Sequence, residues 1–284
     1  MNSRNVDTLS IGTWNIAQEL VDKIIDDVKD CHGTLCSCSL VCWSWALTCQ
    51  RHLFHRIRLL PPCARYCRRE ATDVPYSKRL YNVLLHSPHI VNYIQALYIY
   101  EGQAEREQDW IGKDKTLPLL LGKLTKLERL EFRRLEWDSL GSDLKESLYA
   151  VLGLPTMTYL EIGGAHFLNL KDLEAWLYHA KALTGLSIDS PWILQPRLSN
   201  KEEGAKEKGL NSVQQKHLAD LHLRLSDEQP FLYWLLGPRS HFSLSRIQTL
   251  HIAVPYDVTA VNLLLRTIGN SLKQCKLEGL WRCE

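Results

Sequence analysis

The stretch Glu128–Phe132, ERLEF, places two apolar residues, Leu130 and Phe132, on either side of one polar residue. This alternation is typical of a short β-strand with one buried face. Six further stretches share the pattern: QALYI (95–99), TYLEI (158–162), TGLSI (184–188), ADLHL (219–223), QTLHI (248–252) and KQCKL (273–277). Their second apolar positions follow one another at intervals of about 25 to 35 residues, so the sequence repeats one unit along its length.

Helical patterns separate several of these strands, at 142–154, 169–183 and 257–269. A unit of one strand and one helix cannot bury its apolar edge alone, but stacked neighbours can bury a continuous core. The sequence therefore predicts an α/β fold in which a curved solenoid carries a parallel sheet. The charged segment SNKEEGAKEKGLNS (199–212) is predicted to be a surface insertion.

The residue between the two apolar positions of each stretch must point to the opposite face of the sheet. If the strands stack in parallel, these residues form one polar column, which repeat proteins often use to bind partners. Its mixture of both charge signs favours a protein or peptide partner over nucleic acid, while a solvated face without a partner remains the alternative. The candidate substrate-binding residues are Tyr98, Glu131, Glu161, Ser187, His222, His251 and Lys276.

The N-terminal part has a different, helical pattern. In residues 16–29, Ile16, Leu20 and Ile24 recur every four positions, which predicts an amphipathic helix. A second helix is predicted through the cysteine-rich stretch CSCSLVCWSW (36–45), and a third short helical segment follows in CQRHLFHRIRL (49–59). The predicted organisation is a small three-helix domain at 12–60, a helical connector at 61–92 and a repeat domain at 93–284.

Composition excludes several classes of protein. The chain has 284 residues, a formal net charge of +2 and 45% hydrophobic residues, which is ordinary for a globular protein and too weakly basic for a nucleic-acid or anionic-membrane partner. No apolar run approaches the roughly 20 residues that a membrane helix needs. The N-terminus lacks the pattern of a secretory signal. We therefore expect an intracellular protein, cytoplasmic or nuclear, with no membrane partner.

Nine cysteines raise the question of a metal site. Structural zinc usually takes two close pairs of ligands, and here Cys49 and His52 form the only close mixed pair in the cysteine-rich region. Packing of small apolar residues is the favoured interpretation, with no metal and no cofactor. The sequence also lacks nucleophile-elbow, zinc-protease, phosphate-loop and dinucleotide motifs, so we expect no enzymatic activity and no catalytic residues.

The N-terminal residues resemble an F-box. The F-box pattern has a Glu-Leu pair, spaced isoleucines and a later Val-Cys-x-x-Trp, which are matched in order by Glu19–Leu20, Ile24 and Val41–Cys42 with Trp45. Two features differ, because Ile16–Ala17 stands where the family has Leu-Pro and Trp43 where arginine is common. As a whole, the chain resembles F-box proteins of fungal type with a degenerate leucine-rich-repeat-like C-terminal domain.

This resemblance implies a function. F-box helices dock on the Skp adaptor of an SCF-type cullin–RING ubiquitin ligase, and the repeat domain holds a protein substrate for ubiquitination. The resemblance places adaptor contacts at Ile16, Ala17 and Leu20, and extends them to Ile24, Val41 and Trp45, although periodicity alone leaves open whether these side chains form the internal core instead. The alternative function is a non-catalytic repeat scaffold whose divergent F-box does not engage the ligase.

Overall fold

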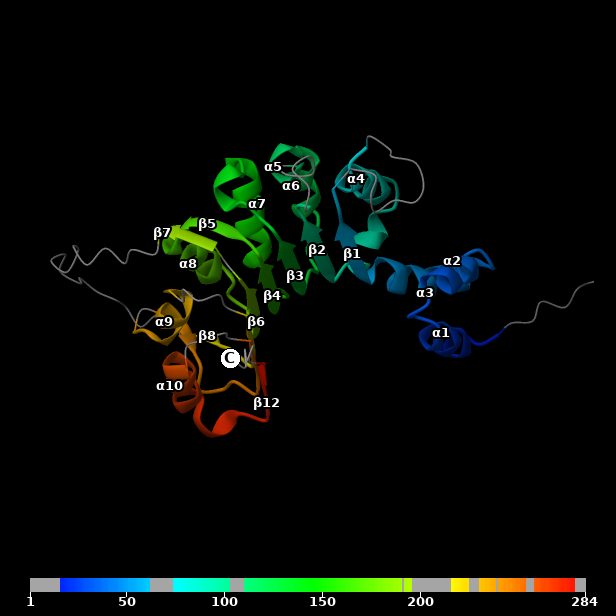
Figure 1. The fold of residues 1–284 in the computed structure, drawn as a ribbon. Coiled ribbons are helices and arrows are strands. Elements are labelled where there is room, and N and C mark those ends of the chain that lie inside the picture. Colours follow the sequence, from blue (N-terminus) through cyan, green and yellow to red (C-terminus); the bar gives the residue numbers. More distant parts are fainter. Residues whose placement is uncertain are drawn as a thin grey trace, which may run out of the picture. The chain divides into compact units, whose positions relative to one another are not determined.

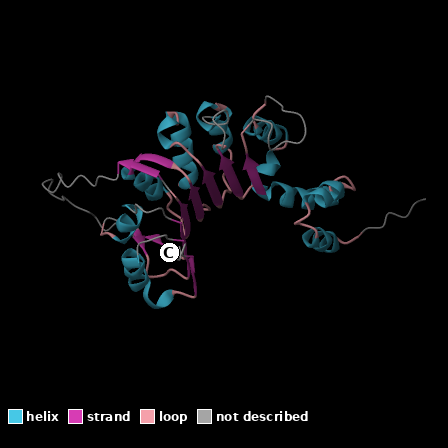
Figure 2. Cartoon of the chain, viewed as in Figure 1, coloured by secondary structure: helices cyan, strands magenta, loops and turns pink. Residues whose placement is uncertain are grey.

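The computed structural model describes residues 16–61, 74–102, 110–190, 192–195, 216–224, 230–238, 240–253 and 258–278. The chain divides into two compact units, unit 1 up to Phe54 and unit 2 from His55 onward. The fold is mixed α/β and contains a parallel eight-stranded sheet, as the sequence predicted at this level (Figure 2). The predicted insertion at 199–212 lies outside the described residues.

Unit 1 is built from three helices around a small core. They are α1 (Gln18–Asp27), α2 (His32–Cys38) and α3 (Trp43–His55), whose last residue falls at the unit boundary. The core consists of four buried side chains, and four more pack partly buried against it; the buried ones are Val21, Ile25, Leu35 and Cys49, and the others are Val28, Cys38, Trp45 and Leu53. A core this small is the expected limit for a unit of this length.

The stretch 36–45 is not one helix, contrary to the prediction. α2 ends at Cys38 and α3 begins at Trp43. The Ser37 hydroxyl donates to the Gly33 carbonyl (3.1 Å) and the Ser39 hydroxyl donates to the Cys36 carbonyl (2.7 Å). Serine side chains that bind nearby backbone compete with continued helix, so the chain turns here.

Unit 2 is organised by its sheet, in which strand order follows chain order. All neighbouring strands are parallel. The strands are β1 (Arg56–Leu59), β2 (Ala96–Tyr100), β3 (Arg129–Arg133), β4 (Tyr159–Gly163), β6 (Gly185–Asp189), β9 (Asp220–Arg224), β11 (Thr249–Ala253) and β12 (Gln274–Glu278). Seven of these are the strands that the repeated pattern predicted.

β1 is the strand that the pattern missed. Its residues, RIRL, were predicted as the end of the third N-terminal helical segment, but they pair with β2 in the same register as the later strands. The division between the compact units accordingly falls after Phe54, ahead of the boundary predicted at residue 60. Its single alternation of charged and apolar residues was hidden by the helical pattern before it.

The helices of unit 2 lie on one face of the sheet and leave the other open (Figure 1). The α-helices are α4 (Tyr76–His86), α5 (Trp110–Lys113), α6 (Thr116–Leu121), α7 (Ser142–Leu152), α8 (Leu170–His179), α9 (Pro230–Leu236) and α10 (Val258–Ile268). Short 3-10 turns occur at Pro88–Tyr93, Trp137–Ser139 and Gly269–Ser271. Two small parallel pairs complete the unit, β5 (His166–Asn169) with β7 (Trp192–Gln195) and β8 (Lys216–His217) with β10 (Phe242–Ser243).

The core of unit 2 lies between the sheet and these helices. The two apolar positions of each strand from β2 to β11 are buried, and α8 contributes Trp176, which packs 5.2 Å from the Phe132 ring. At the last strand the burial stops, because Leu277 of β12 is 57% exposed. An aromatic cluster fills the space beneath β3 and β4; its members are Phe132, Trp137, Phe167 and Trp176.

The backbone repeats as regularly as the side chains. The residues that follow β3, β4 and β6 are Arg134, Gly164 and Ser190, and all three have positive φ. Each donates its N–H to the carbonyl of the last residue of the next strand, at 2.8, 2.7 and 2.6 Å. Arginine and serine adopt this conformation at a cost of about 1 kcal/mol, so the hydrogen bond to the neighbouring unit must offset it.

Candidate functional site

The open face of the sheet carries the polar column that the sequence predicted from alternation. Register places one residue of each strand in a straight row across the sheet. This middle row consists of Arg58, Tyr98, Glu131, Glu161, Ser187, His222, His251 and Lys276. All seven predicted substrate-binding residues are therefore brought together, and Arg58 of β1 is an eighth member.

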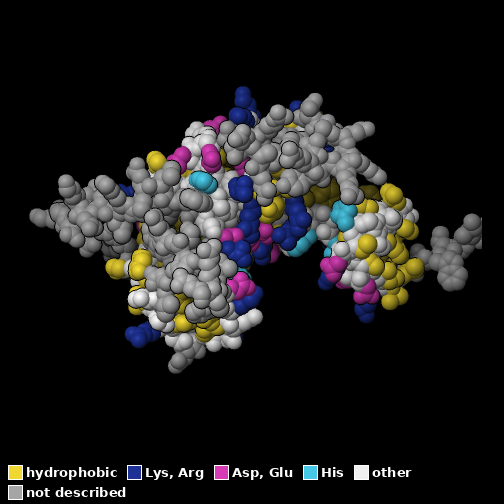
Figure 3. Space-filling view, viewed as in Figure 1, with side chains coloured by type: hydrophobic (Ala, Val, Ile, Leu, Met, Phe, Trp, Pro, Cys, Tyr) yellow, Lys and Arg dark blue, Asp and Glu magenta, His cyan; other side chains and the backbone are white. Residues whose placement is uncertain are grey.

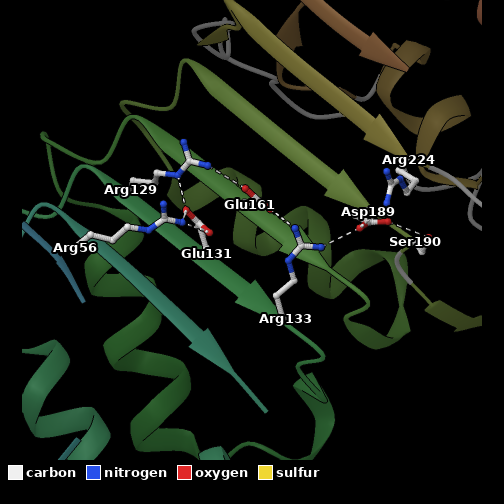
Figure 4. A network of polar contacts seen from close by, with 8 residues as sticks. All are labelled: Arg56, Arg129, Glu131, Arg133, Glu161, Asp189, Ser190 and Arg224. Atoms are coloured by element: carbon white, nitrogen blue, oxygen red, sulfur yellow. Dashed lines mark hydrogen bonds and ion pairs between the residues drawn. The ribbon is translucent and has the colours of Figure 1, made fainter. Parts of the chain in front are cut away.

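Charged side chains of the middle row and of the positions on either side of it form a continuous series of ion pairs, shown in Figure 4. We call this series the charge ladder; from β1 to β6 it consists of Arg56, Glu131, Arg129, Glu161, Arg133 and Asp189. Glu131 accepts from Arg56 Nη2 at 2.8 Å and from Arg129 Nε at 2.7 Å. The ladder therefore joins side chains from four strands, β1, β3, β4 and β6, and passes over β2.

Glu161 continues the ladder from β4. It accepts from Arg129 Nη2 at 3.0 Å and also binds Arg133. Arg133 Nη1 then donates to Asp189 Oδ2 at 2.9 Å. Glu131 and Glu161 therefore each bind two arginines, which fixes those arginines over the sheet.

Burial within the ladder is uneven. The Glu131 side chain is only 6% exposed, whereas Arg56 and Arg129 above it are 46% and 39% exposed. Burial alone would lower the pKa of Arg129, but its hydrogen bond to Glu131 and the neighbouring carboxylates hold that pKa above its usual value. The acids thus lie beneath the arginines, whose guanidinium groups form the surface that a partner would meet.

Two glycines make room for this arrangement. A Cβ at Gly163 would collide with the Arg133 side chain, and one at Gly185 would lie 2.5 Å from the Tyr159 ring. Tyr159 in turn stacks under Arg129, whose guanidinium carbon is 3.9 Å from the ring centroid. Any larger residue at Gly163 would push Arg133 away from Asp189.

Toward the end of the sheet, histidines occupy the middle-row positions that are glutamates on β3 and β4. The His222 and His251 rings lie 5.6 Å apart in an edge-to-face arrangement. Burial and the neighbouring His251 lower the pKa of His222. His251 Nε2 lies 3.4 Å from Glu278 Oε1, and Lys276 Nζ lies 2.5 Å from the same oxygen.

A pocket of ≈ 150 Å³ opens on this face over β6, β9 and β11. It forms where two small residues, Ser187 and Ala253, stand among larger ones. Arg133, Asp189, His222, Arg224 and His251 provide its long side chains. The arrangement offers hydrogen-bond donors around a space the size of one side chain.

Unit 1 carries a second candidate site, made of exposed apolar side chains that Figure 3 shows gathered on its surface. Of the predicted adaptor-binding residues, Ile16, Leu20, Ile24 and Val41 are 50%, 54%, 44% and 63% exposed, and Ala17 is exposed too. The buried face of α1 is carried instead by Val21 and Ile25.

Trp45 stands apart from that set. It is partly buried and packs against the core of unit 1, so it supports the helices from inside. Two apolar residues that the sequence reasoning did not select are among the most exposed, Leu40 at 86% and Trp43 at 72%. Their signal was Ser37 and Ser39, whose hydroxyls bind backbone carbonyls where α2 ends, just before Leu40.

The cysteines of unit 1 are free thiols, of which Cys49 is buried and Cys31, Cys36 and Cys42 are exposed. Burial raises the pKa of the Cys49 thiol. Within the described ranges, no group of three or more histidine, cysteine or acidic residues is arranged to hold a metal ion. No described helix has both the length and the apolar character needed to cross a bilayer.

Comparison with known proteins adds no family assignment: no protein-family model matches the chain, and no curated protein matches its sequence.

Proposed function

We propose that the chain is the substrate-recognition subunit of an SCF-type ubiquitin ligase. Unit 1 acts as an F-box that docks on the Skp adaptor, and the open face of the sheet, as part of a leucine-rich-repeat-like solenoid, holds a protein substrate. The protein makes no bonds itself. It raises the effective concentration of the substrate near the ubiquitin-charged enzyme.

The observation that carries this proposal is the exposed apolar surface of unit 1. The described part of unit 1 has a core of four buried apolar side chains and leaves Leu20, Leu40 and Trp43 more than half exposed. Exposed apolar side chains that gather on one surface, as Figure 3 shows for unit 1, are typical of an interaction site. Leu20 and Ile24 of α1 recur at the spacing by which one helix docks along a groove of a partner, and exposed Ile16 lies just before that helix.

The sheet supports the second half of the proposal. Its open face presents both charge signs, tyrosines and histidines in fixed positions, because the ladder holds the arginines before any partner arrives. Side chains that are already ordered lose less entropy on binding. This favours a specific protein surface as the ligand.

The experiment measures binding of the purified full chain to purified Skp adaptor by calorimetry. Leu20→Asp removes about 2 kcal/mol of apolar burial, so we expect affinity to fall by roughly 30-fold or more. Gly33→Asp is the matched control, since it adds the same charge where a Cβ would meet nothing within 4 Å. Its affinity should equal that of the wild type.

Unchanged affinity of a folded Leu20→Asp protein would reject this placement of the docking surface. Absence of adaptor binding by the wild type would favour the alternative, a repeat scaffold that does not engage the ligase. The replacement of Leu-Pro by Ile16–Ala17 is the feature that keeps this alternative in the test.

A further inference from the structure

We propose that the pocket over β6, β9 and β11 receives one anionic group of the bound partner, a carboxylate or a phosphate, with Arg224 as its principal ligand. This inference rests on the proposed recognition role of the sheet's open face and adds the chemistry that the face selects. It concerns a single position in the partner, since ≈ 150 Å³ holds one side chain.

The charge of the pocket lining favours an anionic ligand. The pocket is lined by two arginines, Arg133 and Arg224, and by one acid, Asp189. That acid is already occupied, because Oδ2 accepts from Arg133 at 2.9 Å and Oδ1 accepts from the Ser190 hydroxyl at 3.1 Å. A cationic ligand would meet two arginines and a carboxylate that is already paired, whereas an anionic ligand would meet the guanidinium donors.

Arg224 is the arginine of the pocket that can bind an added anion. Its side chain is 61% exposed, and Nη1 lies 3.9 Å from Asp189 Oδ2, which is within ion-pair range but beyond a hydrogen bond. A guanidinium has five N–H donors, so Arg224 can bind a carboxylate or phosphate with two parallel hydrogen bonds. Arg133, by contrast, is already engaged by Glu161 and Asp189.

The other polar residues that line the pocket also favour an anion. Ser187 supplies a hydroxyl, and His222 and His251 supply ring nitrogens that can donate to an anion. Asp220 and Glu161 lie near His222 as well, but neither lines the pocket. The lining therefore offers donors to a ligand and one carboxylate that is already paired.

The test is a titration of the full chain, labelled with ¹³C in its histidine rings, by N-acetyl-aspartate amide and by N-acetyl-phosphoserine amide. The neutral control probe is N-acetyl-asparagine amide, at constant ionic strength and pH. We expect the His222 and His251 ring signals to shift with the anionic probes alone. The probe with the lower Kd identifies carboxylate or phosphate as the group selected.

Arg224→Gln should weaken binding of the tighter-binding anionic probe at least tenfold. Arg266→Gln, which removes an exposed arginine of α10 from the helical face of unit 2, should leave its affinity unchanged. Equal shifts with the asparagine probe, no shift with either anionic probe up to about 20 mM, or full affinity in Arg224→Gln would each overturn the proposal.

Failure of this inference is distinguishable from failure of the proposed function. Adaptor binding depends on unit 1, so the same preparations are also measured against the adaptor. Intact adaptor binding without probe binding rejects the anion pocket alone. Probe binding without adaptor binding rejects the ligase role and retains the pocket.

Discussion

The charge ladder makes a quantitative prediction about Glu131. Glu131→Gln keeps the size of the side chain but removes its charge and sets an amide N–H₂ against the Arg56 guanidinium. The carboxylate accepts three hydrogen bonds, two from Arg56 and one from Arg129. Breaking a fully buried ion pair costs about 3 to 5 kcal/mol. Here both arginines can turn to water, so we expect about 2 kcal/mol.

Hydrogen exchange on peptides that cover β3 and β4 is the suitable measurement, because it reports local opening without assuming that the whole chain unfolds at once. A cost of about 2 kcal/mol corresponds to exchange that is roughly 30-fold faster. The matched control is Glu278→Gln, whose side chain is 41% exposed and pairs with Lys276 at the end of the sheet. Its effect should stay below about 0.5 kcal/mol.

The reasoning is refuted if Glu131→Gln accelerates exchange in these strands less than about twofold, since that would mean that desolvation cancels the pairing. It is equally refuted if Glu278→Gln has the same effect, because burial of the carboxylate would then be irrelevant. Raising the salt concentration to 1 M should reduce the Glu131 effect only slightly, as buried pairs are poorly screened.

Two further predictions concern the core of unit 1 and the histidines. Leu35→Ala should destabilise unit 1 by about 2 to 4 kcal/mol, while Leu40→Ala should change its stability by less than about 0.5 kcal/mol; exchange in α1 measures both, and equal effects would contradict the assigned core. Because the pKa of His222 is lowered, the unfolded chain takes up its proton first and stability is lost as the pH falls below about 6.5. His222→Asn should reduce the loss in urea midpoint between pH 7.5 and 5.5, and an undiminished loss would contradict this.

The alternation of apolar and polar residues was enough to predict most of the sheet. Leu130 and Phe132 are both fully buried while Glu131 lies on the opposite face, and the same holds from β2 to β11. The alternation predicts these strands reliably because one face of each of them is buried against the helices. β1 escaped prediction although Ile57 and Leu59 flank Arg58 in the same alternation, because the helical pattern before it runs directly into the strand; its pairing with β2 reveals it.

The positions of the candidate site residues were predictable, but their partners were not. Register follows from equivalent strands, which is why His222 and His251 could be assigned to one row. Which guanidinium reaches which carboxylate depends on the empty space at Gly163, a tertiary detail. In unit 1, spacing alone could not separate exposed Leu20 from buried Val21, because both lie within a broad apolar stripe.

The hydrogen bonds made by Arg134, Gly164 and Ser190 join β3, β4 and β6 to the strand after each in the same way, although the three residues differ. These three joints therefore offer their neighbours an equivalent backbone surface. A whole unit could be excised or duplicated, and the strands on either side would still meet as compatible partners. Insertion or deletion of one unit would thus change the number of sheet positions that can contact a partner. The hydrogen bonds between the remaining units would stay the same.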